Sequence, residues 1–174
     1  MTRPTLLIAA LAAACCAACS PTLDWREFVP EGTDISVAFP CRPDRHVRTV
    51  AVAGAKAQMQ MLACSAGEAT FALAFVDVAD PARVGATLAE LRATAASNLQ
   101  DASPQNVPLQ IKGMTPNAQA ARITIAGKLP DGAAVQEHAA FFARGLRVYQ
   151  ATVIGAQPAP QVVDTFIAGL KFPG

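Results

Sequence analysis

Residues 70–78 are apolar on both of the faces that a β-strand presents. Phe71, Leu73 and Phe75 occupy one face, because successive side chains of a strand point to opposite sides. The other face carries Ala72, Ala74, Val76 and Val78. A strand with one face in water normally carries polar residues on that face, and this segment has only Thr70, at its start, there. The pattern therefore predicts a strand that is covered on both sides.

Alternation of apolar and polar residues predicts further strands in the body of the chain. Ile35, Val37 and Phe39 share one face of a segment that ends at a proline. Residues 56–64 alternate methionine with glutamine, as expected for a half-solvated strand. The other predicted strands span residues 47–52, 109–112, 118–126, 133–143 and 146–154.

The last predicted hairpin reverses at Arg144 and Gly145. A two-residue loop at these positions would place Phe142 opposite Arg147, so that an aromatic ring could lie under a guanidinium group.

Two segments repeat apolar residues at helical spacing. The first starts at Asp80 and Pro81, an N-cap and a first-turn proline, and continues to about Leu99. Pro158 and Pro160 open the second, whose apolar stripe is Val162, Val163, Phe166, Ile167 and Leu170. Strands in antiparallel succession with two helices predict an α+β fold. We expect a mainly antiparallel sheet covered by two principal helices, in a single-domain sandwich.

A short apolar leader precedes this body. Arg3 is followed by an uninterrupted apolar run over residues 5–14, which is too short to cross a bilayer and is typical of a signal peptide. The small residues before Cys19, with Ser20 after it, resemble the end of a bacterial lipoprotein signal peptide. The resemblance covers residues 1–20, and it implies removal of residues 1–18 and attachment of lipid, such as palmitate, to Cys19.

Two alternatives to this interpretation of the leader stay open. Cys16 stands where such signals usually carry leucine, which leaves Cys15 as a second acceptor for the lipid. An ordinary secretory signal would instead leave a soluble periplasmic protein. On the lipoprotein interpretation, residues 19–32 form the lipid anchor and tether, and residues 33–172 form a single domain. Ser20 is not the aspartate that retains some lipoproteins in the inner membrane, so the outer membrane is favoured if the cell is Gram-negative.

The charge balance argues against a nucleic-acid partner. The chain has 14 basic and 13 acidic residues, and loss of Arg3 with the leader would leave 13 of each. Binding to a polyanion requires a clear excess of positive charge.

Cys41 and Cys64 are the only cysteines beyond the leader. An even number of thiols in an oxidising compartment predicts a disulfide bond between them. A redox or metal pair that includes His46 is the alternative, although zinc sites usually contain closer pairs such as Cys-x-x-Cys.

Three short stretches of the body share a pattern with a known group of domains. They are residues 37–40 (VAFP), residues 147–150 (RVYQ) followed by Gly155, and residues 166–172 (FIAGLKF). Over residues 29–172 the chain loosely resembles uncharacterised bacterial envelope domains of the PsbP/Mog1-like α/β/α type. The resemblance implies a binding or assembly module without chemistry of its own, and it transfers no functional residue.

Few residues suggest chemistry, and no catalytic motif is present. Glu137 and His138 could share proton transfer, but adjacent residues of a strand point to opposite faces, so we expect a surface role for each. His46 and His138 could bind metal with Asp77 or Asp80 only if folding gathers them. We therefore expect no metal and no cofactor.

Two surface features suggest recognition. Arg42, Arg45 and Arg48 form a basic run that could contact lipid headgroups or an anionic polysaccharide, or that could simply be solvated. Trp25 and Tyr149 could form an aromatic recognition surface, although packing roles are favoured.

The expected function is that of a membrane-anchored envelope lipoprotein with a non-catalytic binding or assembly role. Its partners would be the membrane, through the N-terminal lipid, and an envelope protein or polysaccharide. The alternative is a small metal-binding protein or hydrolase that uses His46 and His138.

Overall fold

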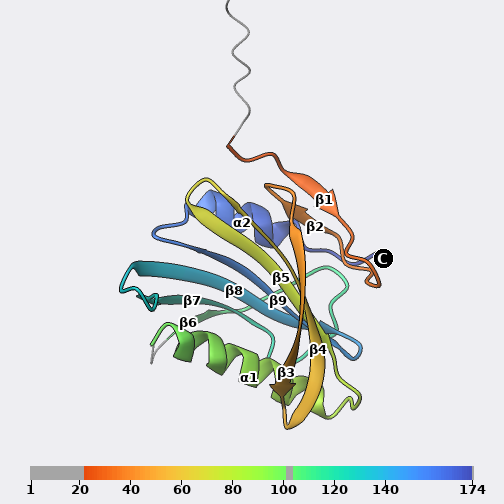
Figure 1. Cartoon of the computed structure of the whole chain (residues 1–174). Coiled ribbons are helices and arrows are strands. Elements are labelled where there is room, and N and C mark those ends of the chain that lie inside the picture. The colour runs from red at the N-terminus through yellow and green to blue at the C-terminus, as the bar shows by residue number, and fades with distance from the viewer. Residues whose placement is uncertain (1–21, 101–103, 174) are drawn as a thin grey trace, which may run out of the picture.

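The computed structural model describes residues 22–100 and 104–173 and shows a mainly antiparallel sheet with two helices (Figure 1). The predicted lipid acceptors Cys15 and Cys19 lie outside the described residues. The strands are β1 Arg26–Phe28, β2 Val37–Phe39, β3 Asp44–Val52, β4 Ala55–Ala66, β5 Ala69–Asp77, β6 Gln105–Val107, β7 Ala121–Lys128, β8 Ala134–Arg144 and β9 Arg147–Gly155. The helices are α1 Arg83–Asn98 and α2 Pro160–Ala168.

Seven strands form one sheet in the order β3-β4-β5-β9-β8-β7-β6, and every neighbouring pair is antiparallel. The predicted α+β class with a mainly antiparallel sheet is therefore confirmed. The chain places β9 between β5 and β8, so β5 becomes an inner strand whose second neighbour comes from the far end of the sequence. A separate two-stranded ladder joins β1 to β2.

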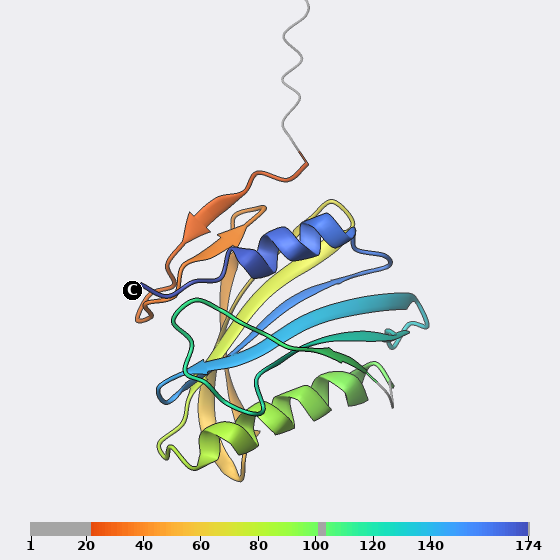
Figure 2. The ribbon, with the colours of Figure 1, turned by 180° about the vertical axis from the view of Figure 1, so that it is seen from behind.

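The strand predicted to be covered on both sides is β5. Its Phe71, Leu73 and Phe75 join one apolar cluster, which also contains side chains of α2. Val76 joins a second cluster on the opposite face of the sheet, which contains side chains of α1 such as Leu88. Figure 2 shows α1 and α2 on opposite sides of the sheet. We call these two sides the α1 face and the α2 face.

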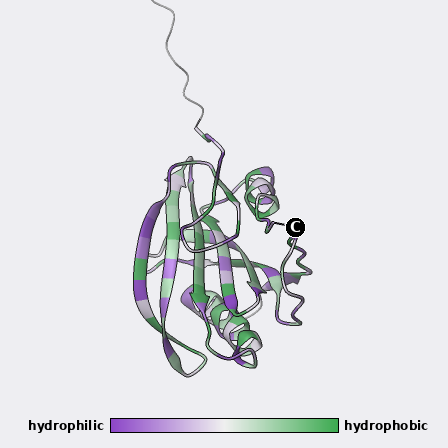
Figure 3. Cartoon of the chain, turned by 90° about the vertical axis from the view of Figure 1, so that its right-hand side faces the viewer, coloured by the Kyte–Doolittle hydropathy of each residue, from purple (hydrophilic) through white to green (hydrophobic). Residues whose placement is uncertain are grey.

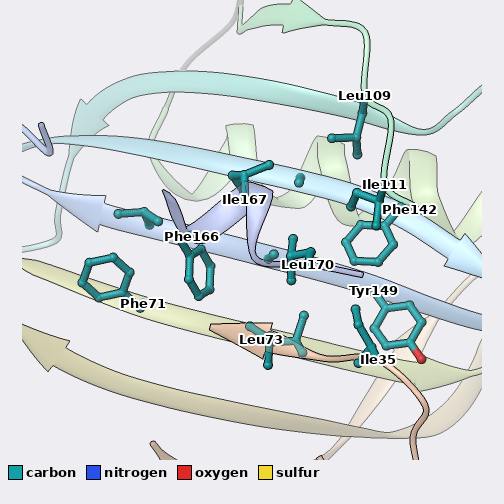
Figure 4. Packing of buried hydrophobic residues seen from close by; sticks show 14 of the residues in the cluster. Ile35, Phe71, Leu73, Leu109, Ile111, Phe142, Tyr149, Phe166, Ile167 and Leu170 are labelled. Atoms are coloured by element: carbon teal, nitrogen blue, oxygen red, sulfur yellow. The ribbon is translucent and has the colours of Figure 1, made fainter. Parts of the chain in front are cut away.

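The α2 face is packed with aromatic rings (Figure 4). Phe166 of α2 makes edge-on contacts with Phe39 and Phe71, at centroid distances of 5.4 and 5.5 Å. Phe142 stacks on Tyr149 at 5.1 Å. Such pairs add about 0.5–1.5 kcal/mol each beyond the burial of their area. The aromatic residues of the sheet and of α2 therefore hold the C-terminal helix in place.

Helix α1 begins later than its proline suggests, whereas α2 begins at one of its predicted prolines. Helix α1 starts at Arg83 rather than Pro81, because the Asp80 carboxylate accepts a hydrogen bond of 2.9 Å from the Ala82 N–H and forms a turn ahead of the helix. Helix α2 starts at Pro160, its first-turn proline. Within residues 22–100 and 104–173, neither helix combines the length and the apolar composition that crossing a bilayer requires.

The predicted hairpin loop was wrong by one residue, which shifts the register of the two strands by two residues. Phe142 lies opposite Tyr149 rather than Arg147, because the two-residue loop consists of Gly145 and Leu146. Gly145 has a φ of +57° and is the first residue of that loop, the position at which a type II′ turn requires glycine. The guanidinium of Arg147 does lie over a ring, but the ring is that of Phe75, at 5.3 Å.

The predicted strand at residues 109–112 is also wrong. The strand next to β7 is β6, which lies earlier in the chain. Leu109 and Ile111 alternate because both are buried in the α2-face cluster, and the only bridge of this segment joins Lys112 to Lys171. Burial without a ladder gives the same sequence pattern as a strand.

Hydropathy along the sheet follows the pairing. Figure 3 shows bands of hydrophilic and hydrophobic residues along the outer strands. Ile35, Val37 and Phe39 share one face as predicted, and each is fully buried. The segment expected to be a tether contains β1, and its Trp25 contacts Phe71 edge-on at 5.8 Å.

Candidate functional site

The predicted disulfide bond is present. The Cα atoms of Cys41 and Cys64 lie 6.0 Å apart, and the bond joins the segment before β3 to β4. Asp44 opposite Ala63 is the first pair of the β3–β4 ladder, so the disulfide lies immediately beside the end of the ladder. It fixes the start of β3, and it leaves neither thiol available for redox chemistry or metal binding.

The basic run does not form one patch. Cross-strand partners share a face of a sheet. Arg45 lies opposite Leu62, on the α2 face, where it pairs with Glu31 at 2.7 Å. Arg48 lies opposite Met59, on the α1 face. The structure therefore separates these two guanidinium groups, and Arg42 lies ahead of the strand in an exposed position.

The two histidines are also far apart. His46 is exposed on β3, and it lies opposite Met61 on the α1 face. His138 lies on the α2 face of β8, four strands away, which corresponds to about 19 Å between the strand axes. Nδ1 of its ring lies 3.1 Å from the Thr124 hydroxyl, and burial together with the nearby Arg122 cation lowers the pKa of His138.

The aspartates proposed as metal ligands have structural partners instead. Asp77 accepts two hydrogen bonds from Arg147, at 2.6 and 2.7 Å, and Asp80 forms the turn before α1. Within residues 22–100 and 104–173, no three His, Cys, Asp or Glu side chains come close enough to hold a metal ion.

Glu137 is buried, and the expectation of a surface role for it was wrong. It is 7% exposed on the α1 face, whereas the adjacent His138 points to the α2 face, as expected for neighbours on a strand. Its cross-strand partners on this face are Ile125 and Ile154. Burial raises the pKa of Glu137 to about 7, and the hydrogen bond from Thr152 partly offsets this effect. No sequence pattern marks it, because a glutamate in an alternating strand normally lies on the solvated side.

A short polar chain reaches Glu137 from within the sheet. The Gln150 amide donates to the Thr152 hydroxyl at 3.2 Å, and that hydroxyl donates to the Glu137 carboxyl at 3.5 Å. Both partners come from β9 and are half-buried. This series of hydrogen bonds contains a proton acceptor but no nucleophile activated by a base. Its geometry is that of a buried acid rather than of a catalytic pair.

The aromatic candidates have packing roles. Tyr149 is 1% exposed in the α2-face cluster, and burial raises the pKa of its hydroxyl to about 12. Trp25 is half-buried against Phe71. Tyr149 therefore offers no open ring surface to a ligand.

One edge of the sheet is open. In the part of the chain that the structure describes, strand β3 has β4 as its only neighbour, and its residues from Asp44 to Thr49 are all exposed. Val47 is 55% exposed in the middle of this run. The sequence contains a signal for this edge that the alternation of apolar and polar residues does not reveal. Residues 44–52 contain no proline and no glycine, whereas β6, the opposite edge, is three residues long and lies between Pro104 and Pro108.

The β3–β4 turn shows which backbone groups of β3 point outward. Val52 and Ala55 flank a two-residue loop in which Ala53 and Gly54 both have positive φ, as in a type I′ turn. The residues that flank such a loop hydrogen-bond to each other, and the pattern then alternates along the strand. The even-numbered residues of β3 therefore bond to β4. The backbone groups of its odd-numbered residues face away from the sheet, and these residues are Arg45, Val47, Thr49 and Ala51.

The tip of this hairpin is fixed to α1. Ala53 has a φ of 46°, which is strained for a residue with a side chain. Its N–H donates to the Glu90 carboxylate at 2.6 Å, and its carbonyl accepts from Arg83. These contacts hold the tip of the β3–β4 hairpin against α1.

Comparisons with known proteins define no family for this chain. No protein-family model and no curated protein sequence matches it. A solved structure from Bacteroides thetaiotaomicron is similar over 86% of this chain and 48% of its own length, with a TM-score of 0.48 and 10% sequence identity. The chain thus spans about half the length of that protein.

Proposed function

We propose that this protein is an envelope lipoprotein, anchored by lipid on Cys19 or alternatively Cys15, that binds another envelope component without chemistry of its own. The leader and the small residues before Cys19 support the anchor. The bond between Cys41 and Cys64 is consistent with the oxidising compartment to which such a leader directs a protein. In this proposal the body is a single-domain sandwich in which both helices cover the sheet.

The observation that carries the proposal is the apolar leader that ends in small residues before Cys19. Only a few residues lie between Cys19 and the start of the described fold. A Cβ placed on Gly67, in the β4–β5 turn, would lie 3.7 Å from Thr22 and 3.9 Å from Leu23. Three residue steps separate Cys19 from Thr22, and they span about 10 Å at most. A lipid on Cys19 would therefore hold this end of the sheet next to the membrane.

In this proposal the two ends of the sheet would lie at different distances from the membrane. The β9 end at Gly155 pairs with Ala69, so the start of α2 lies at the same end of the sheet as the anchor. The hairpin loops at Gly54 and Gly145 lie at the opposite end and would face away from the membrane (Figure 1).

Metabolic labelling with palmitate tests the anchor. We expect label on the natural protein, loss of label and of membrane association in Cys19→Ser, and normal labelling in Cys15→Ser. The reverse result would move the lipid to Cys15. An unlabelled natural protein with a free amino terminus beyond Cys19 would contradict the anchor. Fractionation then tests the favoured outer-membrane position, which recovery in the inner membrane alone would contradict.

The alternative of a metal-binding protein or hydrolase gains no support from the site. His46 and His138 lie on opposite faces of the sheet, so they would have to act separately. Metal analysis of the purified protein tests it: stoichiometric metal that is lost in both His46→Ala and His138→Ala would favour this alternative over the binding role.

A further inference from the structure

The two edges of the seven-stranded sheet are treated differently by the sequence. Edge strands present unpaired N–H and C=O groups, and proteins usually shorten them, interrupt them with proline or cover them. Strand β6 is both short and bounded by prolines. Strand β3 is nine residues long and uninterrupted, and it is exposed up to Thr49.

The open groups of β3 form a regular row. Arg45, Val47 and Thr49 direct their backbone groups outward, and in the described residues these groups have no backbone partner. Because β4 and the contacts of Ala53 hold β3 in an extended conformation, an added strand would not have to order it first. This row is a template for adding one more strand.

The side chains of this edge determine which strand would fit. The segment from Arg42 to Val52 contains a single acidic residue, Asp44, and three arginines, which are Arg42, Arg45 and Arg48. Glu31 already neutralises Arg45, whereas Arg42 and Arg48 have no carboxylate partner among the described residues. The exposed Val47 lies between Arg45 and Arg48 and supplies a small apolar contact.

We infer that β3 is a docking edge for an extended acidic segment of another envelope protein, which adds to the sheet beside β3. An apolar residue of that segment would lie against Val47. A carboxylate at the neighbouring position would point to the α1 face and meet Arg48, because adjacent residues of a strand alternate between faces.

A second copy of this chain fits the same edge less well. Pairing β3 with another β3 would bring together two strands that each carry Arg45 and Arg48, with Arg42 of each copy just ahead of its strand. Like charges opposite each other destabilise a ladder. Arg42 and Arg48, which have no carboxylate partner among the described residues, therefore favour an acidic partner over a second copy.

This inference rests on the proposed binding role but not on the lipid anchor. Failure of palmitate labelling would contradict the lipid anchor but would not bear on the docking edge. Failure of the peptide experiment below would remove the docking edge, whatever the labelling result.

A pair of peptides tests the inference on the protein as purified from cells. One capped eight-residue peptide alternates valine with glutamate, and the other alternates valine with lysine. We expect saturable binding of the glutamate peptide and at least about tenfold weaker binding of the lysine peptide. Hydrogen exchange should slow at the amides of Arg45, Val47 and Thr49. The even-numbered amides, already bonded to β4, should change little.

Three variants separate strand addition from simple charge attraction. Arg48→Glu should weaken binding of the glutamate peptide about tenfold and improve binding of the lysine peptide. Arg26→Glu changes an exposed arginine on β1 and should alter neither. Val47→Pro removes an outward N–H that β4 does not use, and it should abolish the slowed exchange.

Several results would overturn the inference. They are equal binding of the two peptides, no binding at millimolar concentration, or slowed exchange elsewhere than β3. If, without peptide, the protection of the β3 amides from exchange increases with protein concentration, the edge binds a second copy of the chain instead. Should Val47→Pro fail to fold, the comparison of Arg48→Glu with Arg26→Glu still decides the matter.

Discussion

The carboxyl group of Glu137 lies 3.5 Å from the hydroxyl of Thr152 and is 93% buried between apolar neighbours of the sheet. A buried carboxylate with one long hydrogen bond is poorly compensated for the water that it has lost. The pH dependence of stability should therefore carry the signature of this residue.

We expect Glu137 to make the protein less stable at alkaline pH. Its pKa in the folded protein is about 7, above the ordinary value of 4.5, so the folded state binds the proton more tightly than the unfolded chain. The free energy of unfolding should then fall as pH rises from about 4.5 through 7. The whole effect amounts to about 3 kcal/mol, at 1.36 kcal/mol per pH unit.

Glu137→Gln tests this expectation. Urea unfolding should give similar stability for the variant and the natural protein at pH 4.5, and a variant more stable by about 2–3 kcal/mol at pH 8.5. Glu68→Gln, in the exposed β4–β5 turn, serves as the matched control and should change neither value. A Glu137→Gln curve parallel to that of the natural protein would show that the carboxyl does not ionise in this range.

Removal of the disulfide should cost a large part of the stability. The Cys41–Cys64 bond joins residues 23 positions apart, and closing a loop of that length stabilises by about 3 kcal/mol in the chain-entropy model. Chemical unfolding with and without reductant measures the loss. The double variant Cys41→Ser and Cys64→Ser should already show the lower stability and should not respond to reductant.

The guanidinium of Arg147 should contribute more to the free energy of unfolding than that of an exposed arginine. It bonds twice to Asp77, donates to the Gly32 carbonyl and lies over Phe75. Lysine cannot make the forked contact or stack in the same way. We expect Arg147→Lys to lower the free energy of unfolding by about 1–2 kcal/mol.

Arg26→Lys is the control for Arg147→Lys. The side chain of Arg26 is 71% exposed and pairs with Asp24, and solvent screens such an exposed pair so that it contributes little to stability. Equal losses in the two variants would mean that Arg147 contributes no more than a surface ion pair.

Two glycines should respond to alanine in opposite directions. A Cβ on Gly127 would lie 2.0 Å from the Leu99 carbonyl oxygen, so β7 and the end of α1 would have to separate. A Cβ on Gly85, inside α1, would meet nothing closer than 3.8 Å. Thermal unfolding should show Gly127→Ala destabilised by about 1–3 kcal/mol and Gly85→Ala stabilised by about 0.5–1 kcal/mol.

This glycine pair also tests the contact between α1 and β7. If Gly127→Ala were as stable as the natural protein, the end of α1 would not lie against β7 as described.

Local patterns predicted much of the fold correctly. The alternation in residues 70–78 predicted β5 and its cover on both sides, because side-chain direction along a strand depends only on neighbouring residues. The same rule separated Glu137 from His138. The count of cysteines beyond the leader predicted the disulfide, because only one pairing was available.

Where local patterns were wrong, more than one structure fits the same sequence. Leu109 and Ile111 alternate in a buried loop as they would in a strand. The last hairpin shifted by one residue because either residue of a two-residue loop can be glycine, depending on the turn type. These choices are settled by packing against the rest of the domain.

The sequence by itself determined which segments are apolar, which segments alternate between the two faces of a strand and which cysteines pair. Only the tertiary structure decided that β9 enters between β5 and β8, that Glu137 is buried, that the two histidines lie four strands apart, and that β3 is left at an open edge. The physical reason is that strand order is fixed by contacts between residues far apart in the chain. The residue pattern of one strand carries no information about which other strand lies beside it, or whether solvent does.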